Sequence, residues 1–252
     1  MSEGIAAAVA STYGVPSSRL AVVPNGVDIL TYRPMDQSAC RRELGIPVDA
    51  RVVGFVGAFY SYQRVDRIVE LAPFVLSQHL APLFVLVGDG PRLPTVRERV
   101  AEMGLTDRFL FAGAVPAAVC AKYVNTFDVG VGFHDPKQDG SPMKLLNYLA
   151  CGKPVVTTRS SGTQYLDETQ LGVTVCPDDA RGTTQAIVRY LATDGANSTL
   201  GGRARAEAVL RHSWDAKAAE IARVLCAWAA ESRGQVIRLN RARGDSPIDE
   251  TF

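Results

Sequence analysis

The sequence lacks the apolar run that a membrane-spanning helix needs. No run of about 18 apolar residues occurs in the chain of 252 residues, so no transmembrane helix is expected. The first ten residues are apolar but carry no basic segment, which argues against a secretory signal peptide. An excess of one charge is lacking too. The formal net charge is +1, so nothing electrostatic favours nucleic acid or an acidic membrane as a partner.

Paired cysteines and the motifs of several enzyme classes are also absent. The five cysteines are scattered, at positions 40, 120, 151, 176 and 226, and none forms a Cys-x-x-Cys. This pattern predicts reduced thiols in the cytoplasm, and no spacing of His, Cys and Asp predicts a metal site. The sequence has no Gly-x-Ser-x-Gly, no Gly-x-x-x-x-Gly-Lys-Ser/Thr, and no Gly-x-Gly-x-x-Gly after its first strand. These absences disfavour an α/β-hydrolase, a P-loop enzyme and a dinucleotide-dependent dehydrogenase.

What the sequence does have is an alternation of short β-branched runs and longer helical patterns. Strands of this kind, each followed by a helix, predict an α/β fold with a Rossmann-like, doubly wound parallel sheet. Expected strands cover residues 19–23, 51–56, 83–87, 108–111, 129–133, 154 onward and 172–176. Expected helices cover residues 3–13, 64–79, 94–103, 117–125, 183–192, 201–211 and 214–231.

The richest segment runs from Asp139 to Val156 and reads Asp-Gly-Ser-Pro-Met-Lys-Leu-Leu-Asn-Tyr-Leu-Ala-Cys-Gly-Lys-Pro-Val-Val. Ser141 is a good N-cap, Pro142 suits the first helical position, and a glycine ends the pattern before the next strand. A helix start of this kind offers free amides and the positive end of the helix dipole to an anion. Lys144 adds a positive charge in the first turn.

This segment resembles the donor-binding motif of the GT-B glycosyltransferases, in particular the retaining family 4-like (group 1) enzymes. Their motif has an acid, seven residues, a Glu and then Gly-Lys-Pro-Val-Val. Asp139 and Asn147 stand at the two acid positions here. The resemblance implies the C-terminal half of a GT-B fold, with a UDP- or GDP-sugar as the donor, no other cofactor and no obligatory metal.

A second resemblance concerns the domain organisation. Residues 24–28, Pro-Asn-Gly-Val-Asp, resemble the hinge at which such enzymes pass from the N-terminal to the C-terminal domain. We therefore expect residues 1–30 to be the remnant of a preceding domain and residues 31–231 to form the donor-binding domain. Residues 232–252 are expected to form a flexible tail. A separate N-terminal acceptor domain is the partner that this organisation implies.

The loops that follow the strands supply the first candidate site residues. In the resembling family, the loop that corresponds to the one after residues 51–56 holds the donor diphosphate. It does so with an Arg just after the Gly and a Lys several residues later. Gly57 is followed here by Ala58, Gln63 takes the place of the Lys, and Arg64 is the nearest substitute or else a solvated charge. Gly88, in Gly-Asp-Gly-Pro, is expected in the pocket wall. The backbone of Val115 is expected near the nucleobase.

The remaining candidates lie in the motif itself. Asp139 is the candidate catalytic acid that contacts the sugar, although a simple turn aspartate fits the sequence equally well. Asn147 is expected at the ribose, where an amide binds less strongly than a carboxylate. Lys144 is expected at the diphosphate. Substrate contacts are also expected from Gly140, Ser141, Met143 and Leu145.

Two functions remain open at this point. The first is a glycosyltransferase, or its donor-binding half, that transfers a sugar with retention. The second is a non-catalytic subunit that binds a nucleotide sugar, or docks on a partner of a split glycosyltransferase. The altered acids and the missing basic residues favour the second.

Overall fold

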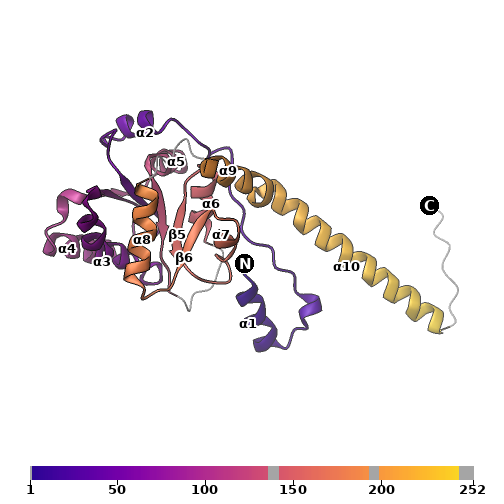
Figure 1. Ribbon diagram of the computed structural model, residues 1–252. Coiled ribbons are helices and arrows are strands. Elements are labelled where there is room, and N and C mark those ends of the chain that lie inside the picture. Colours follow the sequence, from indigo (N-terminus) through magenta and orange to yellow (C-terminus); the bar gives the residue numbers. More distant parts are fainter. Residues whose placement is uncertain (1, 136–141, 193–198, 244–252) are drawn as a thin grey trace.

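The computed structural model describes residues 2–135, 142–192 and 199–243, with side chains up to Ala230. A six-stranded parallel sheet lies at its centre (Figure 1), with the strand order β3-β2-β1-β4-β5-β6. The strands are β1 Val52–Val56, β2 Leu83–Val87, β3 Phe109–Gly113, β4 Val129–Gly132, β5 Val155–Thr158 and β6 Gly172–Val175. The predicted Rossmann-like fold is therefore confirmed, and the order of the strands reverses between β1 and β4.

Helices cover both faces of this sheet, as the short apolar strands require. One core cluster joins the sheet to α3, α4 and α8, and the other joins it to α5, α6 and α9. Figure 1 shows α3 and α8 on one side of the sheet and α6 on the other. The helices are α1 Glu3–Tyr13, α2 Gln37–Glu43, α3 Val65–Val75, α4 Leu93–Glu102, α5 Ala117–Thr126, α6 Met143–Ala150, α7 Tyr165–Glu168, α8 Ala180–Leu191, α9 Thr199–His212 and α10 Trp214–Arg243.

The predicted strand over residues 19–23 is wrong. Residues Ser17–Arg19 form a 3₁₀ turn, and the chain then runs without strand partners to Val27. A β-branched run becomes a strand only beside another strand, and the described structure places none there. The preceding α1 likewise buries none of its residues. The assignment of residues 1–30 to a neighbouring domain is consistent with both observations and stays a prediction.

The helices differ from the predicted ones most clearly in four places, the first being α2, which was not predicted. The helix predicted to run to residue 79 ends as α3 at Val75 and continues as a π-helical turn over Leu76–Leu80. The one-turn helix α7 was not predicted, because four residues are too few for a periodic pattern. Helix α10 continues to Arg243, into the segment 232–252 that was assigned to a tail. Arg, Gln and Leu in this segment are good helix formers.

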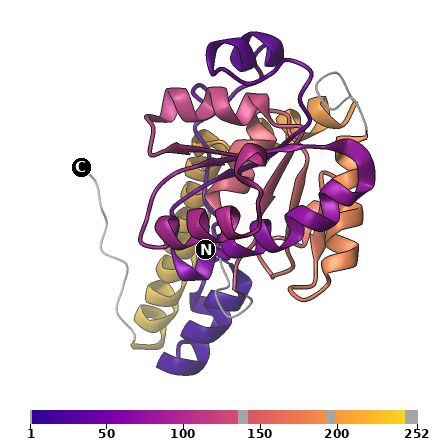
Figure 2. The same ribbon diagram turned by 90° about the vertical axis from the view of Figure 1, so that its left-hand side faces the viewer.

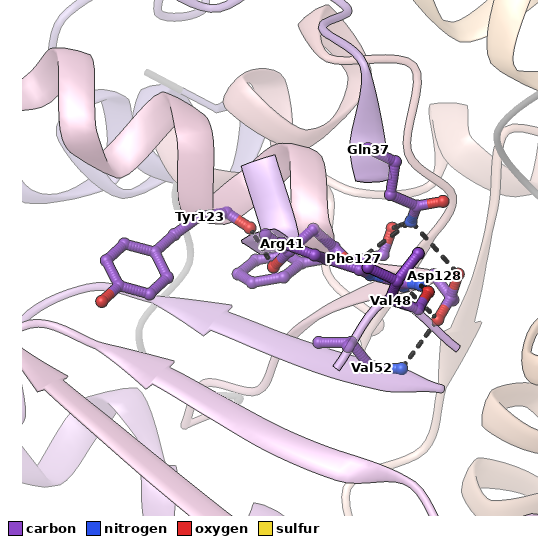
Figure 3. A network of polar contacts seen from close by, with 8 residues as sticks. Gln37, Arg41, Val48, Val52, Tyr123, Phe127 and Asp128 are labelled. Carbon is purple, nitrogen blue, oxygen red and sulfur yellow. Dashed lines mark hydrogen bonds and ion pairs between the residues drawn. The ribbon is translucent and has the colours of Figure 1, made fainter. Parts of the chain in front are cut away.

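A buried ion pair lies where β1 and β4 begin, at the edge opposite the carboxyl ends of the strands (Figure 3). The Arg41 guanidinium donates to the Asp128 carboxylate at 2.9 Å, and both side chains are 6% exposed. The same carboxylate accepts the Val52 amide at 2.7 Å and the Gln37 side-chain amide at 3.2 Å. The pair is thus hydrogen-bonded on several sides, which is what a buried pair needs to be tolerated.

Tyr148, on α6, connects this helix to the sheet through a hydrogen bond. It is fully buried, and its hydroxyl accepts the Val56 amide at 2.8 Å and donates to the Val131 carbonyl at 3.3 Å. Replacing Tyr148 by phenylalanine leaves the Val56 amide buried without its acceptor. We expect a loss of about 1–3 kcal/mol in the free energy of unfolding, measured by urea denaturation. Tyr13→Phe, at a residue that is 75% exposed, is the control and should change it by less than about 0.5 kcal/mol. An unchanged stability in Tyr148→Phe would contradict this role.

Helices α1 and α10 project away from the sheet (Figures 1 and 2). The chain enters and leaves the sheet domain at one point, where Val27 forms a parallel bridge with Ser213. The Val27 amide donates to the His212 carbonyl at 2.7 Å. Gly26 lies under Trp214, since a Cβ at this glycine would be 2.6 Å from the indole ring. Over the parts of the chain with assigned structure, no helix combines the length and apolarity needed to cross a bilayer.

Candidate functional site

The carboxyl ends of β1 and β4 form the topological switch point of the sheet. The chain leaves β1 toward α3 on one face and leaves β4 toward α6 on the other. Loops that diverge in this way leave a crevice above the two strands, and ligands of open α/β sheets bind there. Most of the predicted site residues belong to these two loops or to the strand ends beside them.

Lys144 reaches across this crevice from the first turn of α6. Its ammonium donates to the Gln63 side-chain oxygen in the 3₁₀ turn Ser61–Gln63, which follows β1. The same ammonium lies 4.7 Å from the centre of the Phe55 ring, near the end of β1. The structure therefore brings Lys144 and Gln63 together, as the prediction of a shared site requires. Gln63 was expected at the donor diphosphate, and in the structure its side-chain oxygen contacts Lys144.

Glycines make room for the Lys144 side chain. A Cβ at Gly57 would lie 3.2 Å from both Cε and Nζ of Lys144. A Cβ at Gly132, the last residue of β4, would lie 3.2 Å from Cδ of the same side chain. The lysine thus lies over two strand ends that carry no side chain of their own at these positions. Phe55 and Gly132 are site residues that the sequence analysis missed.

Gly57 and Gly88 form one wall of the crevice through close backbone contact. A Cβ at Gly88 would be only 2.0 Å from the Gly57 carbonyl oxygen, and φ is +132° at Gly88. The Gly57 amide donates to the Val87 carbonyl at 3.0 Å, and the Gly88 amide donates to the Gly113 carbonyl at 2.8 Å. The ends of β1, β2 and β3 are therefore tied together, and the role of Gly88 in a pocket wall stays a prediction.

Burial changes the charge of the lysine. Loss of solvation lowers the pKa of the Lys144 ammonium from 10.5 to about 7. Gln63, its hydrogen-bond acceptor, carries no charge. About half of the Lys144 side chains are therefore charged at pH 7, and the described neighbours do not neutralise the charged form. Such a group favours an anionic ligand, because an anion would restore the stabilisation that water no longer provides.

Arg64 belongs to a different cavity. Its backbone is in the left-handed region, with φ and ψ both 42°, and its guanidinium lies 3.7 Å from the Asp66 carboxylate. Arg64 also lines a small cavity of about 10 Å³, together with Arg67, Phe133, His134, Thr158, Val175, Cys176, Pro177 and Thr183. Lys144 is not part of this lining. The predicted role of Arg64 at the diphosphate stays a prediction.

The start of α6 is only partly described. Asp139, Gly140 and Ser141 lie outside the described residues, so their predicted roles stay predictions. Pro142 is the N-cap and has an extended conformation, so it precedes the helix rather than opening it as predicted. Met143 is the first helical residue and is 50% exposed.

Three further candidates lie in different surroundings. Asn147 is half-buried and lies one turn after Met143 and Lys144, on the less buried side of α6. The Leu145 side chain is 1% exposed in the core, and its amide donates to the Pro142 carbonyl at 3.1 Å. Leu145 therefore anchors the helix. Val115 is half-buried after β3 and packs against the same core cluster.

Metal ligands were considered as well. Within the described ranges, no three side chains of His, Cys, Asp or Glu come close enough together to hold a metal ion. The cysteines in these ranges are free thiols, of which Cys40, Cys120 and Cys151 are buried.

Comparison with known proteins identifies the family. The model of the family "Glycosyl transferases group 1" matches residues 50–193, more than half of the chain. A D-inositol 3-phosphate glycosyltransferase of Acidothermus cellulolyticus is 32% identical over 213 residues, which are 81% of this chain and 47% of that protein. An N-acetyl-alpha-D-glucosaminyl L-malate synthase of Bacillus anthracis is 25% identical over 75% of this chain and 49% of its own length. The chain thus spans about half the length of these curated relatives.

Solved structures show the same fold. The Anabaena protein HepE, crystallised with UDP and glucose, superposes with a TM-score of 0.76 at 20% identity over 89% of this chain and 61% of its own. The C-terminal domain of the group 1 glycosyl transferase LpcC from Francisella tularensis has a TM-score of 0.64 at 15% identity, over 75% of this chain and 100% of its own. The chain therefore belongs to the group 1 glycosyltransferase family, and its sheet domain has the fold of a GT-B C-terminal domain.

Proposed function

We propose that this chain binds the nucleoside-diphosphate sugar of a retaining glycosyltransferase and is the donor-binding half of that enzyme. The observation that carries the proposal is the Lys144 ammonium, held over the ends of β1 and β4 with an uncharged partner. Family membership supports it, as do the UDP and glucose in the HepE crystal structure. UDP- or GDP-sugar is the donor class that we propose.

We propose the following roles for the groups around the crevice. Lys144 binds the diphosphate and stabilises the negative charge that develops on it as the sugar leaves. The glycine backbone at Gly57 and Gly88 lets the phosphates approach closely. Asn147 is proposed to contact the ribose, and the Val115 backbone to contact the base. Asp139, with Gly140 and Ser141 beside it, is proposed to face the sugar. Acceptor groups are proposed to come from an N-terminal domain.

A non-catalytic binding subunit is the second candidate, and two residues favour it. Ala58 and Asn147 replace an arginine and a glutamate that the family resemblance leads one to expect. Loss of a carboxylate at the ribose weakens binding, because charged acceptors make stronger hydrogen bonds than amides. Transfer of a radiolabelled sugar, assayed with and without an added N-terminal domain, separates the two candidates. Transfer in either arm supports the enzyme, and bound donor without transfer in both arms supports the binding subunit.

Nucleotide binding itself is tested by thermal denaturation with a panel of nucleoside diphosphates. A ligand at 100 times its Kd adds about 2.7 kcal/mol, which is about 5 to 11 °C in Tm for a domain of this size. We expect UDP or GDP to produce this shift and Lys144→Ala to abolish it. Lys122→Ala removes an exposed lysine that pairs with Glu43 on α2, and should keep the shift. If no nucleotide raises the Tm of the native chain, the proposed function is wrong.

A further inference from the structure

The Lys144 ammonium has no negatively charged partner among the described residues. Its described contacts are the Gln63 side-chain oxygen and the face of the Phe55 ring, and its chain passes close to Gly57 and Gly132. Aromatic faces and amide oxygens attract a cation, but neither removes its charge. Removal from water disfavours the charged ammonium, so the neutral amine has the lower free energy in such surroundings at a pH above the lowered pKa.

The residues around this lysine make the same point. β1 contributes Phe55, Gly57 follows that strand, the 3₁₀ turn contributes Gln63, and β4 contributes Gly132. None of these residues is ionisable. Burial lowers the pKa of Lys144, and among the described residues no neighbouring charge contributes to the shift. Residues 136–141 lie outside the described part of the chain.

We propose that Lys144 exchanges Gln63 for the diphosphate of the donor, and takes up a proton as it does so. Gln63 is then a positioning residue, which holds the lysine by a hydrogen bond and releases it to the ligand. This inference rests on the proposed nucleotide binding. The reaction is a proton transfer from buffer to the Lys144 amine, and the resulting ammonium pairs with the phosphate oxygens.

The pH dependence of nucleotide affinity follows from the pKa of Lys144 without ligand and with the diphosphate bound. Without ligand the pKa of Lys144 is about 7, so most of these side chains are neutral at pH 8. An adjacent diphosphate favours the charged form and raises the pKa toward its ordinary value of about 10.4. Binding is therefore strongest at low pH and weakens as the pH rises through 7. The Kd should increase about fivefold between pH 7 and pH 8, because the protonated fraction falls from about 0.5 to about 0.1.

The test is calorimetric titration of the chain with UDP and GDP at pH 8, in buffers of different ionisation enthalpy. At this pH the phosphates, with a pKa near 6, are fully ionised and contribute almost no proton. The native chain should take up about 0.9 proton per nucleotide. Lys144→Arg should bind with an uptake near zero, because a guanidinium is always charged. Gln63→Glu should also lose the uptake and bind more weakly, since a carboxylate keeps the lysine protonated before the ligand arrives.

A titration without ligand completes the test. The ¹³C signal of the Lys144 side chain, assigned by its absence in Lys144→Arg, should titrate near pH 7. A pKa above about 9.5, or nucleotide binding by the native chain with no proton uptake at pH 8, overturns this inference and leaves the proposed function intact. Failure of both nucleotides to bind at any pH overturns the proposed function and the proton uptake with it.

Discussion

Asp128→Ala is expected to lower the free energy of unfolding by about 3–5 kcal/mol, the largest loss of stability among the substitutions considered. The carboxylate of Asp128 accepts Arg41, the Val52 amide and Gln37, and all these contacts lie at the start of β1 and β4. Its removal leaves the Arg41 guanidinium buried and without its counter-charge. Other acceptors of Arg41, the Thr126 and Val48 carbonyls, carry no charge and cannot neutralise it.

Lys153 adds to this effect. It is the lysine of the Gly-Lys-Pro-Val-Val motif, it is 5% exposed, and burial lowers its pKa to about 8 while the Asp128 charge acts in the opposite direction. Removing Asp128 therefore takes away a charge that favours the Lys153 ammonium, next to Arg41, whose charge disfavours it. The motif lysine thus lies in the polar network around Asp128, where β1 and β4 begin.

The expected loss corresponds to a decrease of about 6 to 20 °C in Tm, measured by calorimetry or circular dichroism. Glu43→Ala is the matched control, because it removes a carboxylate from the exposed pair with Lys122. Exposed pairs of this kind contribute about 0–1 kcal/mol, so the Tm should move by only a few degrees. A loss below about 1 kcal/mol in Asp128→Ala would show that the network at the base of the sheet is not needed for stability.

Gly88→Ala is expected to destabilise the chain and abolish nucleotide binding together. The added Cβ would be 2.0 Å from the Gly57 carbonyl oxygen, a backbone atom that cannot turn aside as a side chain can. The φ of +132° is a second obstacle, since side chains rarely allow it. The ends of β1 and β2 must therefore separate, and Lys144 would lose the surface on which it lies. We expect a loss of at least about 3 kcal/mol.

Gly104→Ala separates the effect of the positive φ from the effect of the close contact with Gly57. Gly104 also has a positive φ, of +66°, but nothing lies within 4 Å of a Cβ added there. Its substitution should cost about 1–2 kcal/mol from backbone strain alone and leave the nucleotide-induced rise in Tm unchanged. If Gly88→Ala were no more harmful than this control and still bound nucleotide, the close contact with Gly57 would not matter for the crevice.

The fold was predictable where the sequence pattern is local. The β-branched run at residues 52–56 and the helix from Met143 to Ala150 follow from short-range periodicity, and the structure confirms both. The ending of α6 was predictable as well, because Gly152 adopts a φ of +72° that favours glycine. The strand expected at residues 19–23 failed, since strand formation needs a neighbour that no local pattern supplies.

The site was predictable in its residues but not in its contacts. Lys144 and Gln63 were each predicted as candidates, but they are 81 positions apart in the sequence, so no local pattern reveals the hydrogen bond that joins them. Arg64 was expected to help with the diphosphate, and this stays a prediction; its guanidinium lies 3.7 Å from the Asp66 carboxylate. The left-handed backbone of Arg64, from which the chain enters α3, is not visible in composition or spacing.

The bridge between Val27 and Ser213 has a mechanical consequence. The segment that follows α1 and the segment that begins α10 are fastened to each other before either reaches the sheet. A force on α1 and a force on α10 are therefore transmitted to the sheet domain at one shared connection, and not at two independent ones. A domain attached to these two helices would therefore move as a unit relative to the sheet domain. The contact between Gly26 and the Trp214 ring lies at the point about which it would rotate.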